Sequence, residues 1–483
     1  MTPGGTDAAT DRRPLAVAID LGSTMIKAAV LDVDGSLAAS RALEAPPLAG
    51  EGEIREGDAV AYTAAADELL AWLARRVPRR TPLGIASQRS SFLLWDRDNG
   101  TPLAPMISWQ DRRAADWCTR QAGLDEEIAR VTGLVLSAHY VGPKLATLVE
   151  RERRWREWLR GGQSLFGTLE CYLTWRWSER HVHETDVTMA ARTAMFDLER
   201  GDWSEELLAR FDVPRAVLPR VRPTTGRRVP LTNGLVLTAG VADQAAGALA
   251  LFDPATSGTV VNLGTGAFVL RPMPDARERL PGYLTAPILA PADGRTTYAV
   301  EGSINGAGAA IDRFGRGPTD LPEQDPRPEA YCLPDAAGLG APYWRPEWGF
   351  TLSDAAQTLD SADLRRVTLE GLLFRIRQVV EDLSPGRSPD RLLLAGGLTR
   401  EPAVARGLAA LVGRSVHVLD SHEAVLIGAA RMAAGRPAFA APATSAIDPG
   451  SEGAYLRSKY PRWKEWLRSL ISDPRGQTRD TAS

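Results

Sequence analysis

The side chains best suited to chemistry follow an apolar run near the start of the chain. Residues 15–34 read LAVAIDLGSTMIKAAVLDVD, and Asp20 comes at the end of the first apolar run. A short polar turn and a cation follow it, in the order Gly22, Ser23, Thr24 and Lys27. Backbone N–H groups, hydroxyls and a cation suit the oxygens of a polyphosphate, and a carboxylate suits a hydrated Mg²⁺ ion. An ordinary β-hairpin with a polar turn has the same composition, so this segment alone leaves both interpretations open.

Glycine-rich turns follow apolar runs at two further places in the chain. The first turn is Gly264, Thr265 and Gly266, and the second contains Gly396 and Gly397. One such turn is weak evidence for a ligand site, because most glycines lie in turns for steric reasons. If the two halves of the chain face each other, however, the first hairpin and the first of these turns would hold phosphates from both sides. The last turn would leave room for a flat base.

Length and composition narrow the class of protein. A chain of 483 residues has room for two large domains, and 44% apolar and 24% charged residues are typical of a globular protein. The net charge of −3 gives no electrostatic footprint for nucleic acid. The three cysteines are too scattered for a disulfide framework or a zinc site, no run reaches membrane-spanning length, and the polar start lacks the apolar core of a signal peptide. We therefore expect a cytoplasmic protein with no nucleic-acid or membrane partner.

One group of polar residues has side chains of the types that bind metals, but no cysteine lies near it in the sequence. His181 and His183 lie near Glu184 and Asp186. We interpret this group as a polar strand or loop, since no cysteine accompanies the histidines. Both ends of the chain are polar, and we expect them to be disordered.

The hydrophobic pattern predicts alternating strands and helices, and therefore an α/β fold. Residues 15–33 and 258–270 each predict a β-hairpin around a glycine turn, and each opens one half of the chain, which suggests a duplicated architecture. Further strands are predicted at residues 83–87, 235–240, 297–301, 391–400 and 416–419. Helices are predicted at residues 59–76, 145–159, 164–176, 305–314, 365–383, 404–412 and 424–434.

Six segments carry a family resemblance, namely IASQRSSFLLWDRDNGTPLAPMISWQDRR, LFGTLECYLTWRW, GVADQAAGALA, NLGTGAF, YAVEGSINGAGAAI and GLGAPYW. Together they resemble the FGGY family of carbohydrate kinases, in the superfamily of actin, Hsp70 and hexokinase, and are most similar to its glycerol kinase branch. GVADQAAGALA resembles the catalytic Gly-x-x-Asp-Gln of the family, and NLGTGAF resembles its second phosphate loop.

The resemblance extends over residues 16–434 and implies the fold. We expect two ribonuclease-H-like α/β domains with a cleft between them. Residues 1–245 would form the domain on the sugar or polyol side. Residues 246–440 would form the domain on the ATP side, and residues 441–483 a C-terminal extension and tail.

The resemblance also implies the reaction, which is ATP-dependent phosphorylation of a hydroxyl of a small sugar or polyol. The general base of the family matches Asp243, which would take the proton of the attacking hydroxyl. From the residues alone, Asp243 could equally cap the helix that follows it. Asp20 and Asp243 would lie near a Mg²⁺ ion. The other positions that the resemblance assigns to ATP are Gly22, Ser23, Thr24, Lys27, Gly264, Thr265, Gly266, Gly308, Gly396 and Gly397.

The acceptor site is where this chain departs from glycerol kinases. The resemblance assigns to the acceptor Arg89, Ser90, Trp109, Asp111, His139, Tyr140, Asp243, Gln244 and Phe268. Glycerol kinases have an acidic residue at the position of Ser90, and its carboxylate accepts two substrate hydroxyls. Its loss should change specificity strongly, because a mismatched buried polar group is costly. We therefore doubt that glycerol is the substrate. From the residues alone, Trp109 could also fill the core.

Two further departures fall near the nucleotide. After the glycine pair the family commonly has Asn, whereas this chain has Arg400, Glu401 and Pro402, and the loop after GLGAPYW is short. Two other interpretations stay open, namely glycerol kinase proper and an ATP-binding member that phosphorylates no sugar. A homodimer is compatible with the resemblance. A dehydrogenase is not predicted, since no strand is followed by the spaced glycines of a dinucleotide-binding turn.

Overall fold

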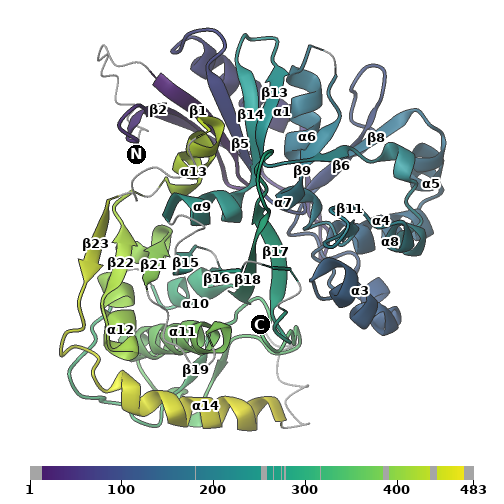
Figure 1. Ribbon diagram of the computed structural model, residues 1–483. Coiled ribbons are helices and arrows are strands. Elements are labelled where there is room, and N and C mark those ends of the chain that lie inside the picture. Colours follow the sequence, from purple (N-terminus) through teal and green to yellow (C-terminus); the bar gives the residue numbers. More distant parts are fainter. Residues whose placement is uncertain are drawn as a thin grey trace.

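Two large mixed β-sheets form the two halves of the molecule (Figure 1). The computed structural model describes residues 14–179, 181–251, 258–264, 266–273, 275–276, 279–315, 317–384, 391–421, 423–435 and 443–472. Within these residues, helices α9 (Asp243–Leu251) and α13 (Ala424–Ala433) lie between the two sheets. The expectation of an α/β fold is confirmed.

The sheet of the N-terminal half has the strand order β13-β14-β5-β1-β2-β3. Strands β1 and β2 form the antiparallel hairpin predicted at residues 15–33, and β3 pairs antiparallel with β2. Strands β1, β5 and β14 run parallel to one another. The bounds are β1 (Pro14–Leu21), β2 (Met25–Asp32), β3 (Leu37–Glu44), β5 (Pro82–Ser87), β13 (Thr225–Pro230) and β14 (Val236–Ala242).

The sheet of the C-terminal half repeats this arrangement, in the order β17-β18-β16-β15-β21-β22-β23. Here β15 and β16 form the hairpin, β18 pairs antiparallel with β16, and β15, β21 and β22 are parallel. The predicted duplication is therefore confirmed. The bounds are β15 (Thr259–Leu263), β16 (Ala267–Met273), β17 (Leu284–Leu289), β18 (Thr297–Ile304), β21 (Leu392–Ala395), β22 (Val416–Leu419) and β23 (Thr444–Ile447).

Smaller sheets extend both halves. A four-stranded sheet in the N-terminal half has the order β4-β7-β6-β8. Its strands are β4 (Glu56–Gly57), β6 (Phe92–Asp96), β7 (Met106–Ile107) and β8 (Ser164–Thr168). Three strand pairs join β9 (Glu184–Asp186) to β12 (Arg220–Arg222), β10 (Phe196–Asp197) to β11 (Asp202–Trp203), and β19 (Cys332–Leu333) to β20 (Thr351–Leu352).

The helices cover the sheets and fill the space between the halves. Among the described residues, no helix is both long enough and apolar enough to span a membrane. The remaining α-helices are α1 (Ala59–Ala74), α2 (Ala115–Arg120), α3 (Asp125–Thr132), α4 (Val141–Arg151), α5 (Arg153–Arg160), α6 (Leu169–Trp177), α7 (Val187–Ala190), α8 (Glu205–Phe211), α10 (Ala307–Asp312), α11 (Ser361–Leu383), α12 (Pro402–Val412) and α14 (Leu456–Ser472). Short 3₁₀ turns are η1 (Ala122–Leu124), η2 (Arg215–Val217), η3 (Asp354–Ala356) and η4 (Gly397–Arg400).

Two helix predictions were wrong in detail. Residues 145–159 form two helices, because Glu152 has an extended backbone (φ −131°, ψ 109°) between α4 and α5. Residues 164–176 begin with strand β8, which pairs antiparallel with β6, and only α6 is helical. In the second case, pairing with a distant strand overrides a local apolar pattern.

Strand β1 is buried on both faces, and its alternating side chains enter two different cores. Val17 and Ile19 belong to the core that α1 and α6 cover. Ala16 and Ala18 belong to the core shared with α9 and α13, so small residues lie where helices approach the sheet closely. A β-carbon on Gly84 of β5 would overlap the backbone of α13 at Ala429. Helix α13, which comes late in the chain, therefore packs against the N-terminal sheet.

We predict that Gly428→Ala destabilises the protein, because the new methyl group would overlap the carbonyl of Ala246 in α9. Overpacking of this kind should lower the free energy of unfolding by about 1–3 kcal/mol. Gly123→Ala is the matched control, since a β-carbon there meets nothing within 4 Å. Urea unfolding of the three proteins measures the effect, and equal midpoints for all three would contradict this account of the packing.

Candidate active site

Asp20 and Asp243 lie at the same edge of the N-terminal sheet. Asp20 is near the end of β1, and Asp243 directly follows β14. Strand β5 lies between these two strands and is parallel to both, with Leu21 and Ala242 both paired to Ser87. Parallel strands present their carboxyl ends at one edge, which is where α/β folds usually bind ligands. The two carboxylates predicted to act together are thus brought together.

The environment of Asp20 suits a cation. Its Oδ1 atom is buried and accepts no hydrogen bond from the described residues. Burial and, to a smaller extent, the charge of Asp243 raise the pKa of Asp20 to about 8, although Lys27 acts in the opposite direction. A divalent cation would supply the missing partner of Oδ1 and compensate both carboxylates. The residues present therefore fit Mg²⁺.

Lys27 joins the two halves of the molecule. Its Nζ lies 3.0 Å from each carboxylate oxygen of Glu423, the residue directly before α13. Both side chains are about one-third exposed, so solvent weakens this pair. Glu423 was not singled out from the sequence, because nothing local indicates that it faces β2.

Asp243 is the first residue of α9. Its Oδ1 accepts the backbone N–H of Gln244 at 2.7 Å and lies 3.9 Å from Nε of Arg89. Burial raises the pKa of Asp243, while Arg89 and the N–H of Gln244 act in the opposite direction. A carboxylate with a raised pKa and no direct ion pair at hydrogen-bond distance is able to take up a proton.

Arg89 belongs to a buried ion cluster that sequence reasoning missed. Nη1 of Arg89 donates to Oε2 of Glu301 at 3.2 Å, and Nη2 of Arg192 donates to the same oxygen at 2.5 Å. Arg89 and Arg192 come from the N-terminal half, whereas Glu301 is on β18 of the C-terminal half. The available signal was an acidic residue inside the apolar strand YAVEGSI.

Aromatic side chains line the neighbourhood of this cluster. The ring of Trp109 lies 5.7 Å from that of His139, which lies 5.2 Å from the ring of Tyr140. Phe268 on β16 lies 5.6 Å from the guanidinium of Arg89. Trp109 is half-buried and belongs to none of the core clusters among the described residues, so it does not simply fill the core. Of the side chains assigned to the acceptor, Phe268 therefore lies next to Arg89, and His139 lies next to both Trp109 and Tyr140.

His139 is held in its neutral form. Burial lowers its pKa well below the usual value, and four cations add to the effect. These cations are Lys144, Arg89, Arg112 and Arg192. A neutral imidazole can both donate and accept a hydrogen bond, which suits a hydroxyl group.

The polar side-chain atoms of Ser90 and Asp111 form hydrogen bonds within the protein. The hydroxyl of Ser90 donates to the carbonyl of Arg192 at 2.9 Å, and Ser90 has a left-handed backbone (φ 63°). Asp111 is fully buried, and its two oxygens accept four hydrogen bonds from the backbone of Arg55 and from Arg113 at 2.7–3.0 Å. The geometry gives Asp111 a role in shaping the segment around Trp109.

Lys144 anchors the same segment from α4. Its side chain is fully buried, and Nζ donates to the carbonyl of Ser108 at 2.8 Å and to that of Trp109 at 3.4 Å. Burial lowers the pKa of Lys144 to about 7, and Asp111 acts in the opposite direction. Both hydrogen bonds form with the charged or the neutral amine, so Lys144 fixes the backbone that carries Trp109.

The glycine turns of the C-terminal half also meet at one place. In the β15–β16 turn, the N–H of Gly264 donates to the carbonyl of Gly266 at 2.9 Å, and Thr265 lies outside the described residues. At Gly396, which has a positive φ of 99°, a β-carbon would overlap the carbonyl of Leu263. Nothing lies within 4 Å of a β-carbon on Gly397. Two of the predicted turns are therefore adjacent, and the second leaves open space.

Hydrogen bonds link these turns to the carboxylate edge. Asn262, at the end of β15, donates from Nδ2 to Oε1 of Gln244 at 2.8 Å. In the first hairpin, Tyr62 donates to the carbonyl of Gly22 at 2.8 Å, while Ser23 is half-buried and Thr24 exposed. Gly308 is buried in α10.

The unusual residues after Gly397 have a local structural role. Glu401 precedes α12 and its Oε1 accepts the N–H groups of Thr319 at 3.1 Å and of Ala403 at 3.4 Å. Its Oε2 also accepts a hydrogen bond from Arg365 at 3.3 Å. Pro402 is the first residue of the helix, where a missing N–H costs nothing.

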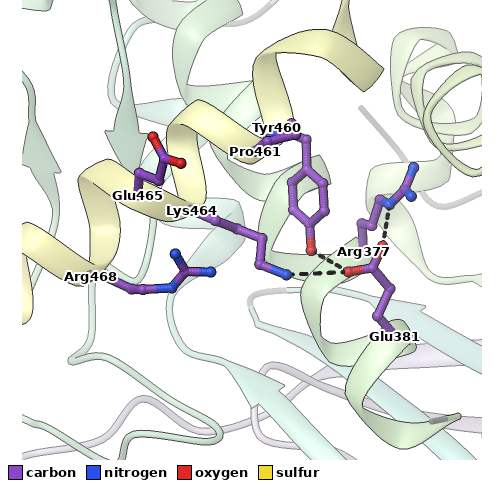
Figure 2. A pocket seen from close by; sticks show the side chains of 7 residues that line it. All are labelled: Arg377, Glu381, Tyr460, Pro461, Lys464, Glu465 and Arg468. Carbon is purple, nitrogen blue, oxygen red and sulfur yellow. Dashed lines mark hydrogen bonds and ion pairs between the residues drawn. The ribbon is translucent and has the colours of Figure 1, made fainter. Parts of the chain in front are cut away.

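A groove on α14 has no catalytic character. It has a volume of about 330 Å³ and is lined by Arg377, Glu381, Tyr460, Pro461, Lys464, Glu465 and Arg468 (Figure 2). As Figure 2 shows, Glu381 is the centre of its charges, with Arg377 and the hydroxyl of Tyr460 at 2.7 Å and Lys464 at 3.6 Å. The groove includes none of the predicted site residues, and its central carboxylate is already neutralised.

His183 and Glu184 are bonded to neighbouring groups of the protein. His183 Nε2 lies 2.8 Å from the carbonyl of Phe166, and Glu184 pairs with Arg222. Across the part of the chain that the structure describes, no three His, Cys, Asp or Glu side chains are grouped to hold a metal ion. The interpretation of this segment as a polar strand or loop is confirmed, since β9 begins at Glu184.

Comparisons with known proteins agree with this geometry. Residues 15–257 match the model of the N-terminal domain of the FGGY family of carbohydrate kinases, and residues 259–435 match that of the C-terminal domain. A glycerol kinase of Methylobacterium nodulans is 33% identical over 455 residues, which cover 87% of this chain and 89% of that relative.

Solved structures of this family share the fold. A Plasmodium falciparum glycerol kinase with ADP superposes with a TM-score of 0.83 at 19% identity, covering 95% of this chain and 99% of the other. A ligand-bound xylulose kinase of Lactobacillus acidophilus gives a TM-score of 0.81 at 18% identity, covering 95% and 98%. The two family models together span most of the sequence, with Asp20, Asp243 and the glycine turns inside them. The chain belongs to the FGGY family of carbohydrate kinases.

Proposed function

We propose that the protein transfers the γ-phosphoryl group of ATP to a hydroxyl of a small sugar or polyol, with Asp243 as the general base. The observation that supports this most directly is that Asp20 and Asp243 share one edge of the N-terminal sheet, with the β15–β16 turn linked to it through Gln244. Membership of the family and the ADP bound to the Plasmodium falciparum glycerol kinase support ATP as the donor.

The two halves would bind different substrates. We assign the acceptor to residues 1–245, where Arg89, Trp109, His139 and Tyr140 lie, with Phe268 reaching across from β16. We assign ATP to residues 246–440, where the turns at Gly264 and Gly396 are adjacent. The first hairpin would meet the phosphates from the other side with the N–H groups of its turn, the hydroxyl of Thr24 and the cation of Lys27.

The reaction then needs one proton transfer and one displacement. A carboxylate oxygen of Asp243 takes the proton of the acceptor hydroxyl, whose oxygen forms a bond to the γ-phosphorus. The bond between that phosphorus and the bridging oxygen breaks, and ADP leaves with the electron pair. Phosphoryl transfer has a loose transition state, so positioning and charge compensation matter more than the strength of the base. Arg89 and the polar atoms of His139 and Tyr140 would orient the acceptor for this displacement.

Mg²⁺ would be held by Asp20, with Asp243 close to it. When bound, it would neutralise the negative charge of the phosphate oxygens. Asp20 contributes a buried oxygen without a hydrogen-bond partner, which is the group in the described site best suited to a cation.

Glycerol is a second candidate for the acceptor. The relative at 33% identity is named as a glycerol kinase, which favours it. Against it, the serine hydroxyl at position 90 already donates to the carbonyl of Arg192 and provides no carboxylate. A larger polyol or a ketose would bring further hydroxyls to the space near His139 and Trp109. Glycerol is therefore one of several acceptors to be tested, and we do not expect it to be the best substrate.

The first test measures ADP release with a panel of polyols, ketoses and aldoses that includes glycerol. The wild-type protein should turn over at least one of them, and Asp243→Asn should lower kcat by about 10²–10⁴-fold, as for loss of a general base. Thr119→Ala, on the surface of α2, is a control that should keep full activity. If no compound gives turnover above the Asp243→Asn protein, the proposed reaction is wrong.

A second prediction concerns the metal. Asp20→Asn keeps the size of the side chain and removes the charge, so the Mg²⁺ concentration needed for half-maximal activity should rise by at least about tenfold. An unchanged Mg²⁺ requirement would remove Asp20 from the metal site.

A third prediction concerns Lys144. Replacing it with Met removes both hydrogen bonds to the backbone at Ser108 and Trp109 while filling the same space. The KM of the acceptor should rise by about tenfold, as expected for the loss of buried hydrogen bonds, and the KM of ATP should stay the same. Steady-state kinetics with each substrate varied in turn separates the two constants. An equal change in both would indicate a general loss of structure.

A further inference from the structure

We propose that Glu301 is a positioning residue that holds the guanidinium of Arg89 away from Asp243 and directs it to the acceptor. This inference rests on the proposed function. It gives a role to a carboxylate of the C-terminal half that touches neither ATP nor the acceptor in the assignment above.

Glu301 is one of the most deeply buried charged groups near the site. Its side chain is 2% exposed, and those of Arg192 and Arg89 are 6% and 12% exposed. Burial alone would raise the pKa of Glu301, but Arg192 and Arg89 outweigh it and hold the pKa below its usual value. Glu301 is therefore ionised, and its ion pairs are largely shielded from solvent.

The geometry at Arg89 shows what Glu301 does. Nη1 of Arg89 donates to Glu301 at 3.2 Å, whereas Nε lies 3.9 Å from Oδ1 of Asp243, beyond hydrogen-bond distance. Among the described residues, Arg89 makes no other side-chain hydrogen bond. The N–H groups at Nε and Nη2 are thus free for an acceptor, and the carboxylate of Asp243 is not occupied by the cation beside it.

The charges around Arg89 balance only while Glu301 is present. Arg89 and Arg192 carry two positive charges, and Glu301 and Asp243 carry two negative ones. Without Glu301, two buried guanidinium groups would face Asp243 as the nearest carboxylate. A buried charge without a partner is costly, so Arg89 would close on Asp243 and form a direct ion pair. That pair would occupy both the base and the group that binds the acceptor.

The elements involved make this a contact between the two halves. Arg89 follows β5 and Arg192 follows α7, both in the part matched by the N-terminal family model. Glu301 is on β18, in the part matched by the C-terminal model. The orientation of the acceptor-binding arginine therefore depends on a residue of the half assigned to ATP.

A double-mutant cycle tests whether Glu301 acts through Arg89. We expect Glu301→Gln to lower kcat/KM for the acceptor by about 50-fold and Arg89→Met by about 100-fold or more, while the KM of ATP changes less than about twofold. The double variant should be no worse than Arg89→Met alone, within about threefold, because Glu301 has nothing left to position. Losses that multiply would show that Glu301 acts independently of Arg89 and would overturn the proposal.

Glu370→Gln is the matched control. Glu370 is also buried and ionically paired, with Lys459 at 2.7 Å and Arg366 at 3.1 Å, but it lies on α11 away from the site. This variant should lose stability without a change in the KM of the acceptor. If Glu370→Gln raises that KM as much as Glu301→Gln does, the effect of Glu301 is a general one of stability.

A crystal structure of the Glu301→Gln protein gives a readout that does not depend on turnover. We expect a nitrogen of Arg89 within 3.2 Å of Asp243, a distance taken from the pair that Arg89 now makes with Glu301. Arg89 unmoved in that structure would overturn the proposal even if the enzyme is active. A different outcome is that the wild-type protein turns over no acceptor while Arg89 has moved as expected in the Glu301→Gln structure. That result would refute the proposed function but would still support the positioning of Arg89 by Glu301.

Discussion

The close packing of α13 against the N-terminal sheet is the constraint on which the site depends. Gly84 lets the backbone of α13 approach β5, and Gly428 lets α13 approach α9. Helix α13 follows β22 of the C-terminal sheet in the chain, but it packs against β1, β5 and β14 of the N-terminal sheet. It therefore fixes the two halves relative to each other. Only with the halves in this relation does Glu301 reach Arg89, and only then does Glu423 reach Lys27.

Much of this arrangement could be predicted from the sequence, because the informative signals are local. The hairpin around Gly22 and the strand directly before Asp243 are short apolar runs with polar ends, so each is recognisable from its own residues. Their repetition in the second half indicated the duplicated sheet. The edge shared by Asp20 and Asp243 then follows from the parallel pairing of β1, β5 and β14.

The residues that the sequence did not reveal act across long distances in the chain. Glu301 and Arg192 are separated by 109 positions and Lys27 and Glu423 by 396, so no spacing rule connects them. Lys144 directly precedes the helix predicted at residues 145–159, and nothing in the sequence distinguishes it until its burial is known. Asp111 illustrates the reverse case, since a motif marks it as a ligand-binding residue while its oxygens are committed to Arg113 and the backbone of Arg55.

If a nucleotide phosphate binds at Lys27 as proposed, the ion pair of Lys27 and Glu423 affects how it binds. In the free protein the lysine already has an anionic partner, so a phosphate that engages it exchanges one anion for another. An ion pair this exposed is worth at most about 1 kcal/mol, which makes the exchange inexpensive. Glu423 then keeps an uncompensated negative charge at the start of α13. If the proposed phosphate position beside Lys27 is filled, the charge balance therefore changes at the start of the helix that packs against both halves.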